Sequence, residues 1–337
     1  MNSPRPLHPN QIDWSALERL RAAFLAGSAG LNDYWQSEQD LASYDATFAQ
    51  RIGWKWDYVL LELQRRGWQP PAGDWLDWGC GSGIASRALL DLFGGPPGTK
   101  LWVHDRSARA TGFALQRAQA KYAGLEAGSG IPQEPALTLL SHVLTELSPE
   151  QTELLLSQVV TRSTTVIWVE PGTYEASYAL IAVRERLRAH FNVVAPCTHP
   201  HGCGMLTAGN EPHWCHHFAT PPPEVFTDGD WARFARLVGV DLRALPVSFL
   251  VLDRRAAPPL PAGATRVLGR PRVYKGFARL LGCAEAGVSE YELSKRRLPD
   301  EFRRIRKDEG DPLQRWQVEG NQITEVESLS FAQPPQV

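Results

Sequence analysis

An apolar segment that ends in an acid, a glycine-rich turn and a helical pattern follow one another between residues 74 and 90. The apolar segment ends at Asp77, and the turn reads Gly79-Cys80-Gly81-Ser82-Gly83. Glycines here allow positive φ angles and let a ligand approach the backbone closely. The N-terminus of the next helix directs free N–H groups at the same place. This order predicts an α/β fold with a ligand at the turn; the alternative is the same turn without a ligand.

The turn has the spacing G-x-G-x-G, and an acid stands two residues before it. A dinucleotide-binding turn would place a third glycine at Ile84, so the motif instead resembles motif I of class I S-adenosylmethionine (SAM) methyltransferases. A second acid, Asp105, ends the next apolar segment, 22 residues after Gly83. In doubly wound folds an acid there accepts hydrogen bonds from a ribose. The residues expected to bind SAM are Asp77, Gly79, Gly81, Gly83, Asp105 and Ser141.

The chain has 337 residues, which suffices for one large domain with additions or for two domains. Its formal net charge is −2, so any surface for nucleic acid must be local. No segment is long and apolar enough to span a membrane, and the N-terminus lacks the apolar stretch of a signal peptide. We expect a cytoplasmic monomer without a membrane partner.

Apolar segments alternate with helical patterns over residues 71–255, which predicts a Rossmann-like parallel sheet of the class I SAM-methyltransferase kind. Residues 1–70 are expected to form a helical cap on this sheet, with a role in an RNA-facing surface as the alternative. A Cys-rich insertion is expected at 196–240, a basic and β-rich extension that closes a metal site at 256–310, and a loosely held tail at 311–337. Strands are expected at 75–78, 101–104, 136–140, 164–169, 191–195 and 248–252, and loops at 94–98 and 124–135.

Three cysteines with the spacing C-x5-C-x11-C lie in a polar loop that follows a predicted strand. A fourth cysteine follows after 67 intervening residues, and Cys80 remains in the glycine-rich turn. Unrelated buried cysteines are one interpretation, and a structural zinc site with three cysteines and a histidine is another. A four-cysteine iron–sulfur cluster tolerates such wide spacing because it is larger than one ion. The members of the set are Cys197, Cys203, Cys215 and Cys283.

These features together resemble the methyltransferase-like family of mitochondrial small-ribosomal-subunit assembly factors and their bacterial relatives (the Rsm-twenty-two or methyltransferase-like-seventeen type). The resemblance covers most of residues 40–310 and includes the segments 44–52, 77–83, 141–147, 169–173, 195–203, 214–216 and 248–250 and the region of Cys283. It implies a SAM-binding Rossmann-like domain and small-subunit rRNA as partner. It also implies a [4Fe–4S] cluster on Cys197, Cys203, Cys215 and Cys283.

Methyl transfer needs an aligned acceptor, and the sequence is less informative on this point. The N/D-P-P-Y/F clamp of enzymes that methylate exocyclic base nitrogens is missing, and Ser141-His142-Val143-Leu144 stands in its place. His142 or Glu170 could act as a general base, or His142 could be a turn residue that packs over the cofactor. The predicted function is SAM-dependent rRNA methylation or subunit assembly. The alternatives are a non-catalytic rRNA-binding factor that keeps SAM as a ligand, and a small-molecule methyltransferase with a structural zinc.

Positive charge gathers near the C-terminus, where residues 266–307 hold 12 Lys and Arg against five Asp and Glu. Basic and apolar residues alternate in part of this region, as expected for a strand with a basic face suited to phosphate contacts. A solvated basic face without a ligand is the alternative. The residues expected to contact RNA are Arg270, Arg272, Lys275, Arg279, Lys295, Arg296 and Arg297.

Overall fold

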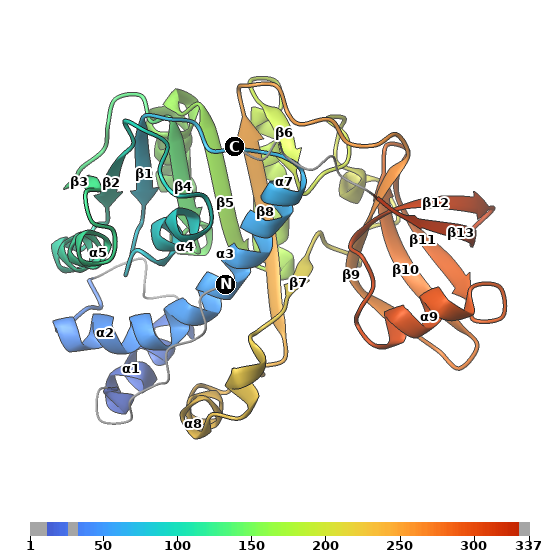
Figure 1. Ribbon diagram of the computed structural model, residues 1–337, viewed down its shortest axis with the longest axis horizontal. Helices are drawn as coiled ribbons and strands as arrows, with labels where there is room; N and C mark the ends of the chain where they lie inside the picture. The colour runs from blue at the N-terminus through green and yellow to red at the C-terminus, as the bar shows by residue number, and fades with distance from the viewer. Residues whose placement is uncertain (1–11, 26–32, 330–337) are drawn as a thin grey trace. The chain divides into compact units, whose positions relative to one another are not determined.

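The computed structural model describes residues 12–25 and 33–329, which form two compact units (Figure 1). The first unit comprises the described residues up to Leu61, then Gln69–Glu170 and Ala219–Leu245. The second comprises Glu62–Trp68, Pro171–Phe218 and the described residues from Pro246 onwards. Among the described helices, none combines the length and the apolar composition that crossing a membrane requires.

Five parallel strands in the order β3-β2-β1-β4-β5 form the sheet of the first unit. Their bounds are β1 (Asp74–Trp78), β2 (Lys100–His104), β3 (Glu126–Ser129), β4 (Leu137–Ser141) and β5 (Thr165–Pro171). The central strands are buried almost throughout, which explains why their sequences are continuously apolar rather than alternating. The predicted α/β class is therefore confirmed.

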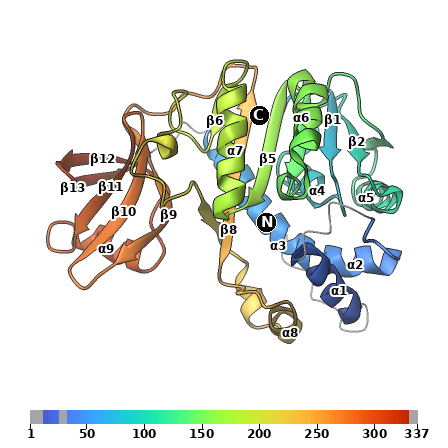
Figure 2. The same cartoon turned by 180° about the vertical axis from the view of Figure 1, so that it is seen from behind.

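Helices cover both faces of this sheet. The helices α4 (Ile84–Phe93) and α5 (Ala108–Lys121) lie on one face, and α6 (Pro149–Gln158) lies on the other (Figures 1 and 2). The start of α6 is a capping box, in which the Ser148 side chain accepts from the Gln151 backbone and the Gln151 side chain accepts from the Ser148 backbone. Each β-strand thus connects to the next through a helix or a short loop on the sheet surface.

The N-terminal region is helical as predicted, with α1 (Trp14–Leu25), α2 (Glu38–Ala46) and α3 (Phe48–Arg65). Asp13 caps α1, because its carboxylate accepts from the Ala16 N–H at 3.0 Å. The helices α2 and α3 are separated at Thr47. The Thr47 hydroxyl donates to the Ser43 carbonyl at 2.7 Å, and the Thr47 backbone leaves the helical region.

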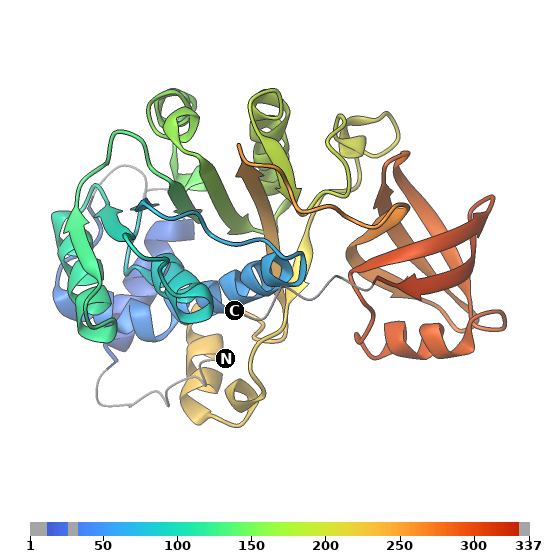
Figure 3. The same cartoon turned by 45° about the horizontal axis from the view of Figure 1, so that its top comes forward.

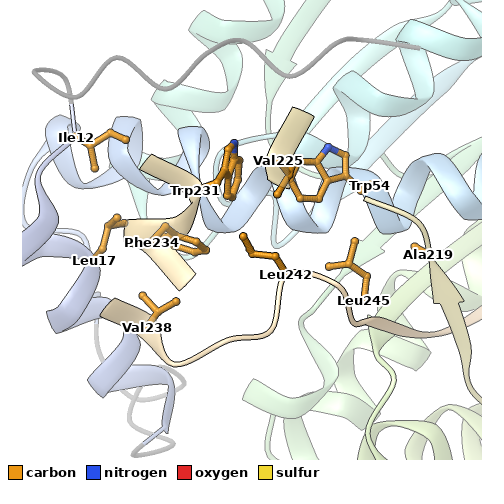
Figure 4. Close-up of a cluster of buried hydrophobic side chains, with 10 residues drawn as sticks. All are labelled: Ile12, Leu17, Trp54, Ala219, Val225, Trp231, Phe234, Val238, Leu242 and Leu245. Carbon is orange, nitrogen blue, oxygen red and sulfur yellow. The ribbon is translucent and has the colours of Figure 1, made fainter. Parts of the chain in front are cut away.

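An apolar cluster joins α1 and α3 to the helix α8 (Gly229–Val238) within the first unit (Figure 4). Trp231 and Phe234 of α8 are almost completely buried. The ring of Trp231 lies 5.1 Å from that of Trp54 and 5.5 Å from that of Phe234. The sequence between Ala219 and Leu245, expected as part of a Cys-rich insertion, thus contributes core residues to the first unit.

The second unit contains α7 (Tyr174–Leu187), the antiparallel strands β6 (Asn192–Ala195) and β8 (Leu245–Asp253), and β7 (His217–Ala219), which pairs with β8. It also contains a closed barrel in the order β10-β11-β13-β12-β9 (Figure 3). The barrel strands are β9 (Ala264–Val273), β10 (Phe277–Ala284), β11 (Gly287–Ser294), β12 (Leu313–Glu319) and β13 (Gln322–Ser328). The helix α9 (Pro299–Arg306) places Phe302 and Ile305 in the apolar core of the barrel.

Two local predictions are wrong. Residues 313–328 are two barrel strands rather than a loose tail, because Leu313 and Ile323 are buried and the Gly320-Asn321 pair turns the chain between them. Residues 330–337 of the predicted tail lie outside the described residues. The loop expected at 124–135 contains β3, whose Glu-Ala-Gly-Ser sequence has little strand preference and is held by its pairing with β2.

We expect Phe234→Ala to destabilise the protein by about 3–5 kcal/mol, because it removes a fully buried ring from the cluster around α8. Urea unfolding followed by circular dichroism measures this change. Arg236→Ala, on the same helix but outside the cluster, is the control and should stay within about 0.5 kcal/mol of the wild type. Equal losses in the two variants would show that the cluster does not carry this stability.

Candidate functional site

The glycine-rich turn has the conformation that its sequence predicts. Gly79, Gly81 and Gly83 have φ angles of 68°, 51° and 78°, a region that favours glycine. The Gly79 and Cys80 N–H groups donate to the His104 carbonyl at 2.7 and 3.1 Å, which ties the turn to the end of β2. A Cβ atom on Gly79 would lie 2.5 Å from Val143 Cγ1. The turn is therefore packed against the segment that follows β4.

Both acids of the motif are held by backbone N–H groups. Asp77 is completely buried, and its Oδ2 accepts from the Ser86 N–H of α4 at 3.2 Å. Its Oδ1 is buried without a hydrogen-bond partner among the described residues, and burial raises the pKa of the carboxyl to about 6. Asp105 accepts from Gly81 at 2.9 Å and from Ser107 at 2.9 Å. The two carboxyl groups thus flank the turn from β1 and β2.

A cavity of about 450 Å³ lies beside Asp105, within the first unit. Its lining comes from the end of β2, the first turns of α5 and the end of β3, and includes His104, Asp105, Arg106, Thr111, Ser129 and Gly130. A cavity at the carboxyl ends of parallel strands is the usual ligand position in open α/β sheets. Such a space, with a carboxylate at one side, suits a nucleoside.

The residues after β4 form a second group of candidates. The Ser141 hydroxyl accepts from Trp56 Nε1 at 2.9 Å, so a protein side chain already uses it. His142 has a φ of 56°, which is unusual for a residue with a side chain. Its Nε2 lies 3.4 Å from Lys55 Nζ. Burial lowers the pKa of His142 and lowers that of Lys55 to about 7, so at physiological pH His142 is neutral and Lys55 is partly deprotonated.

Glu170, the other candidate base, is completely buried at the end of β5. Its Oε1 accepts three hydrogen bonds, from the Val143 N–H at 3.0 Å, the Leu144 N–H at 2.9 Å and Trp168 Nε1 at 2.8 Å. Burial raises its pKa to about 7. In this arrangement the carboxyl group holds the turn after β4.

Lys55 was not predicted from the sequence as a site residue. The signal that could have found it is a single charge between Trp54 and Trp56, on a helix whose neighbouring positions are apolar. Lys55 is only 8% exposed, which is rare for a lysine. It lies on α3, and its partner His142 comes 87 residues later. Only the folded chain therefore brings the two together.

The four cysteines of the predicted metal set all lie in the second unit, and all five cysteines of the chain are free thiols. Burial raises the pKa of the Cys215 thiol, and the nearby Cys197, Cys283 and Cys203 thiols raise it further. Burial likewise raises the pKa of Cys283 to about 12. Cys203, Cys215 and Cys283 also pack against one apolar cluster with Met205 and Val288. The three segments that carry the cysteines therefore meet in space.

Buried cations surround these thiols. Arg184 Nε donates to Cys197 Sγ at 3.2 Å. Arg66 donates to the carbonyls of Pro196 at 3.0 Å and Cys197 at 3.2 Å, and Glu62 forms ion pairs with both Arg66 and Arg266. None of these charged residues was predicted from the sequence to lie at the cysteine site. Arg184 had a possible signal, because it occupies the buried stripe of α7 that also contains Ile181 and Leu187.

The four cysteines and the histidines near them nevertheless do not form a preorganised metal site. Within residues 12–25 and 33–329, no group of three or more His, Cys, Asp or Glu side chains is arranged to hold a metal ion. The nearest imidazoles are His217, whose Nε2 lies 3.9 Å from Cys215 Sγ, and His199, whose Nε2 lies 4.0 Å from Cys283 Sγ. In chemical type, four thiols beside buried guanidinium groups fit an anionic thiolate-bound centre.

The seven predicted RNA contacts lie on or beside the barrel, and the structure separates them into two groups. Four form ion pairs: Arg270 with Asp308, Arg272 with Glu290, Arg279 with Glu290 and Glu292, and Arg297 with Glu319. The other three are exposed and form no ion pair with any residue that the structure describes: Lys275, Lys295 and Arg296. Sequence reasoning did not separate these groups, because the acids that neutralise the first come from other strands and loops.

Comparison with known families gives one match. The family profile described as "Mitochondrial small ribosomal subunit Rsm22" matches residues 67–314. This segment includes the glycine-rich turn and all four cysteines of the predicted set. No curated protein matches the chain.

Several solved structures are distantly similar. A candidate RNA methyltransferase from Pyrococcus horikoshii is 11% identical with a TM-score of 0.36, and the match covers 62% of this chain and 82% of that one. A SAM-dependent methyltransferase from Aquifex aeolicus is 15% identical with a TM-score of 0.35, covering 48% and 93%. TrmK from M. capricolum, in complex with S-adenosylhomocysteine, is 8% identical with a TM-score of 0.33, covering 58% and 67%. Likeness at this level assigns no function.

We expect the stability of the protein to depend on pH through Lys55. Between about pH 7 and 10 the folded state holds Lys55 neutral while the unfolded chain keeps it protonated. The unfolded state then binds more protons, so the Lys55 contribution to the free energy of unfolding rises with pH, by up to about 1.4 kcal/mol per unit. Lys55→Met should remove this slope, as urea unfolding at pH 7 and 9 would measure.

Lys121→Met is the matched control, because Lys121 is partly exposed and forms an ion pair with Asp91. The control should keep the pH slope of the wild type. An unchanged slope in Lys55→Met would contradict the assignment of this titration to Lys55.

Proposed function

The chain belongs to the family of the mitochondrial small ribosomal subunit protein Rsm22, and from that membership we propose that it is a SAM-binding, methyltransferase-like protein that acts on the small ribosomal subunit. The observation that carries the proposal is the family match over residues 67–314, which contains the glycine-rich turn with its two acids. The free thiols suit a reducing compartment, and we propose the cytoplasm.

The proposed SAM site is built on the turn after β1. Its glycines let the ligand approach the backbone, and the carboxylate of Asp105 would accept hydrogen bonds from the ribose hydroxyls. The unpartnered Oδ1 of Asp77 offers a buried acceptor at the turn. Ser141 would line the site from the end of β4, and the cavity beside Asp105 has room for the nucleoside. When bound, SAM supplies an electrophilic methyl group.

Methyl transfer to rRNA is the activity that we propose. A nucleophile that must lose a proton needs a base whose pKa is near neutrality. Burial lowers the pKa of Lys55 to about 7, and Lys55 Nζ lies 3.4 Å from His142 Nε2, so we propose this pair as the base. A second function, in which the protein binds SAM and assists assembly without turnover, is favoured by one observation. Ser141 and Glu170 use their side-chain oxygens to hold the protein's own structure.

We further propose that Cys197, Cys203, Cys215 and Cys283 hold a [4Fe–4S] cluster, with a zinc ion as the alternative. The support is the gathering of four thiols from the 197–215 loop and β10 next to buried arginines. Such a centre would join the three segments of the second unit that carry the cysteines, so its binding would be coupled to folding. The basic residues on the barrel supply the proposed contacts to rRNA.

We expect SAM to bind the full chain and to bind Asp105→Asn about tenfold more weakly. The amide keeps an acceptor for the Gly81 N–H but loses a charged acceptor for the ribose. Isothermal titration calorimetry measures the affinity. Asp91→Asn, at the other end of α4 and paired with Lys121, is the control and should bind like the wild type. Equal affinity in all three proteins would remove Asp105 from the site.

We expect anaerobically purified protein to contain about four iron and four sulfide per chain, and Cys215→Ser to lose most of both. Metal analysis, acid-labile sulfide and the visible spectrum measure this. Cys80→Ser is the matched control, because Cys80 is buried in the glycine-rich turn and should leave the metal content unchanged. One zinc and no sulfide would overturn the cluster in favour of the zinc alternative.

Transfer of a labelled methyl group from SAM to small-subunit rRNA tests the catalytic proposal directly. Incorporation that falls about a hundredfold in His142→Ala would assign the base. Salt-sensitive binding to the rRNA without incorporation would instead favour the assembly factor. Failure to bind small-subunit rRNA would contradict both.

A further inference from the structure

The barrel of the second unit has a recognisable connection order. Its strands pair as β9–β10, β10–β11, β12–β13 and β12–β9 in antiparallel fashion, whereas β11 and β13 are parallel. The helix α9 lies between β11 and β12 in the sequence and packs into the barrel core (Figure 3). A five-stranded Greek-key barrel of this kind is an OB-fold, which binds oligonucleotides or oligosaccharides on its second and third strands and on the loop between the first two.

In this barrel the second and third strands are β10 and β11, and only one half of the face that they form is open. On β10 and β11 the side chains of Leu281, Cys283 and Val288 pack against Met205 and Ile181, so the protein itself covers that half. At the other end of β10, Arg279 is exposed and Phe277 is half-buried. The open half leads directly to the loop between β9 and β10, which is the loop that OB-folds use for binding.

That loop carries an aromatic pair. The Tyr274 N–H donates to the Phe277 carbonyl at 2.8 Å, which closes a tight turn. The two rings are stacked, with centroids 4.7 Å apart and planes 17° from parallel. Tyr274 is 44% exposed, and the guanidinium of Arg279 lies 5.9 Å from its ring and 5.7 Å from that of Phe277. Glu290 and Glu292 pair with Arg279 and thereby hold it beside the rings.

The three unpaired basic residues lie at the same place. Lys275 is within the turn, and the Lys295 N–H donates to the Gly276 carbonyl at 2.9 Å, which puts Lys295 and the adjacent Arg296 against the turn. Three exposed cations without carboxylate partners in the described parts of the chain thus come from residues in or next to the turn that carries Tyr274. The ammonium group of Lys295 lies 6.0 Å from the Phe302 ring, beside the barrel. We call this set the hairpin patch, and its members are Tyr274, Lys275, Phe277, Arg279, Lys295 and Arg296.

We propose that the hairpin patch binds unpaired nucleotides of RNA, with a base stacked on Tyr274 and the flanking phosphates held by Lys275, Lys295 and Arg296. Every base has a flat face that can stack on an aromatic ring, whereas bases in a duplex are already stacked on one another. The inference rests on the proposed function for the identity of the ligand as RNA. It adds that the ligand is single-stranded and names the aromatic residues that hold it.

The test uses the full chain with two fluorescent probes, a 12-nucleotide oligouridine and an RNA duplex of equal length, and measures anisotropy. We expect tighter binding of the single strand. Tyr274→Ala should weaken its affinity by about fivefold to a hundredfold, whereas Tyr274→Phe should retain it, because stacking needs only the ring. Lys275→Ala should reduce the slope of log affinity against log salt by about 0.7.

Arg315→Ala is the matched control, since Arg315 is a basic residue of β12 that pairs with Glu327 and lies outside the patch. It should bind the single strand like the wild type. Circular dichroism melting of each variant checks that the barrel stays folded, and Tyr274→Phe keeps the test decisive if Tyr274→Ala unfolds. Equal binding of both probes, or full affinity in a folded Tyr274→Ala, overturns the inference.

The outcome separates this inference from the proposed function. Binding of small-subunit rRNA that does not depend on Tyr274 overturns the inference alone. Loss of all RNA binding in the wild type contradicts the proposed function as well. A ribosomal protein crosslinked at the hairpin patch, with single-strand binding unchanged by Tyr274→Ala, would make the patch a protein interface and overturn the inference.

Discussion

The parallel pairing of β1 with β2 and β4 is the constraint on which the candidate site depends. Trp78 is level with His104 on one side and with Leu140 on the other, so the strands end at the same edge of the sheet. The glycine-rich turn, Asp105 and Ser141 follow these ends directly. A shift of one residue in either pairing would turn the buried side chains of β1 towards the opposite face. Burial of the central strands therefore also fixes the geometry of the site.

Buried charge recurs in both units, and in each it acts on a loop that carries candidate residues. In the first unit, Glu170 uses one carboxyl oxygen to hold the two N–H groups after His142. In the second unit, Arg66 holds the carbonyls at the start of the cysteine loop while Glu62 compensates its charge. Such networks cost desolvation energy, and here the pairing is incomplete, because Glu170 Oε2 and Arg66 Nε are buried without a hydrogen-bond partner among the described residues. Both loops are thereby held by hydrogen bonds in addition to the burial of apolar side chains such as Val143, Leu144 and Met205.

Local sequence patterns were sufficient for the features that depend on neighbouring residues. The turn at Gly79 to Gly83 and the strands beside it were predicted because a few adjacent residues determine their conformation. The two wrong local predictions have a common cause. In each, pairing with a strand distant in the sequence holds the segment in place. The strand at 126–129 has little strand preference of its own, whereas the hairpin at 313–328 contains strand-favouring residues such as Trp316 and Ile323.

The sequence by itself determined the α/β class and the glycine-rich turn with its two acids, because these follow from apolar periodicity and short-range spacing. Only the tertiary structure decided that Lys55 meets His142, that Arg184 contacts Cys197, and that the C-terminal strands close into a barrel. It also decided which basic residues remain unpaired. The physical reason is the same in each case: burial and ion pairing depend on residues brought together from distant segments, and one strand's pattern carries no information about its partner's charges.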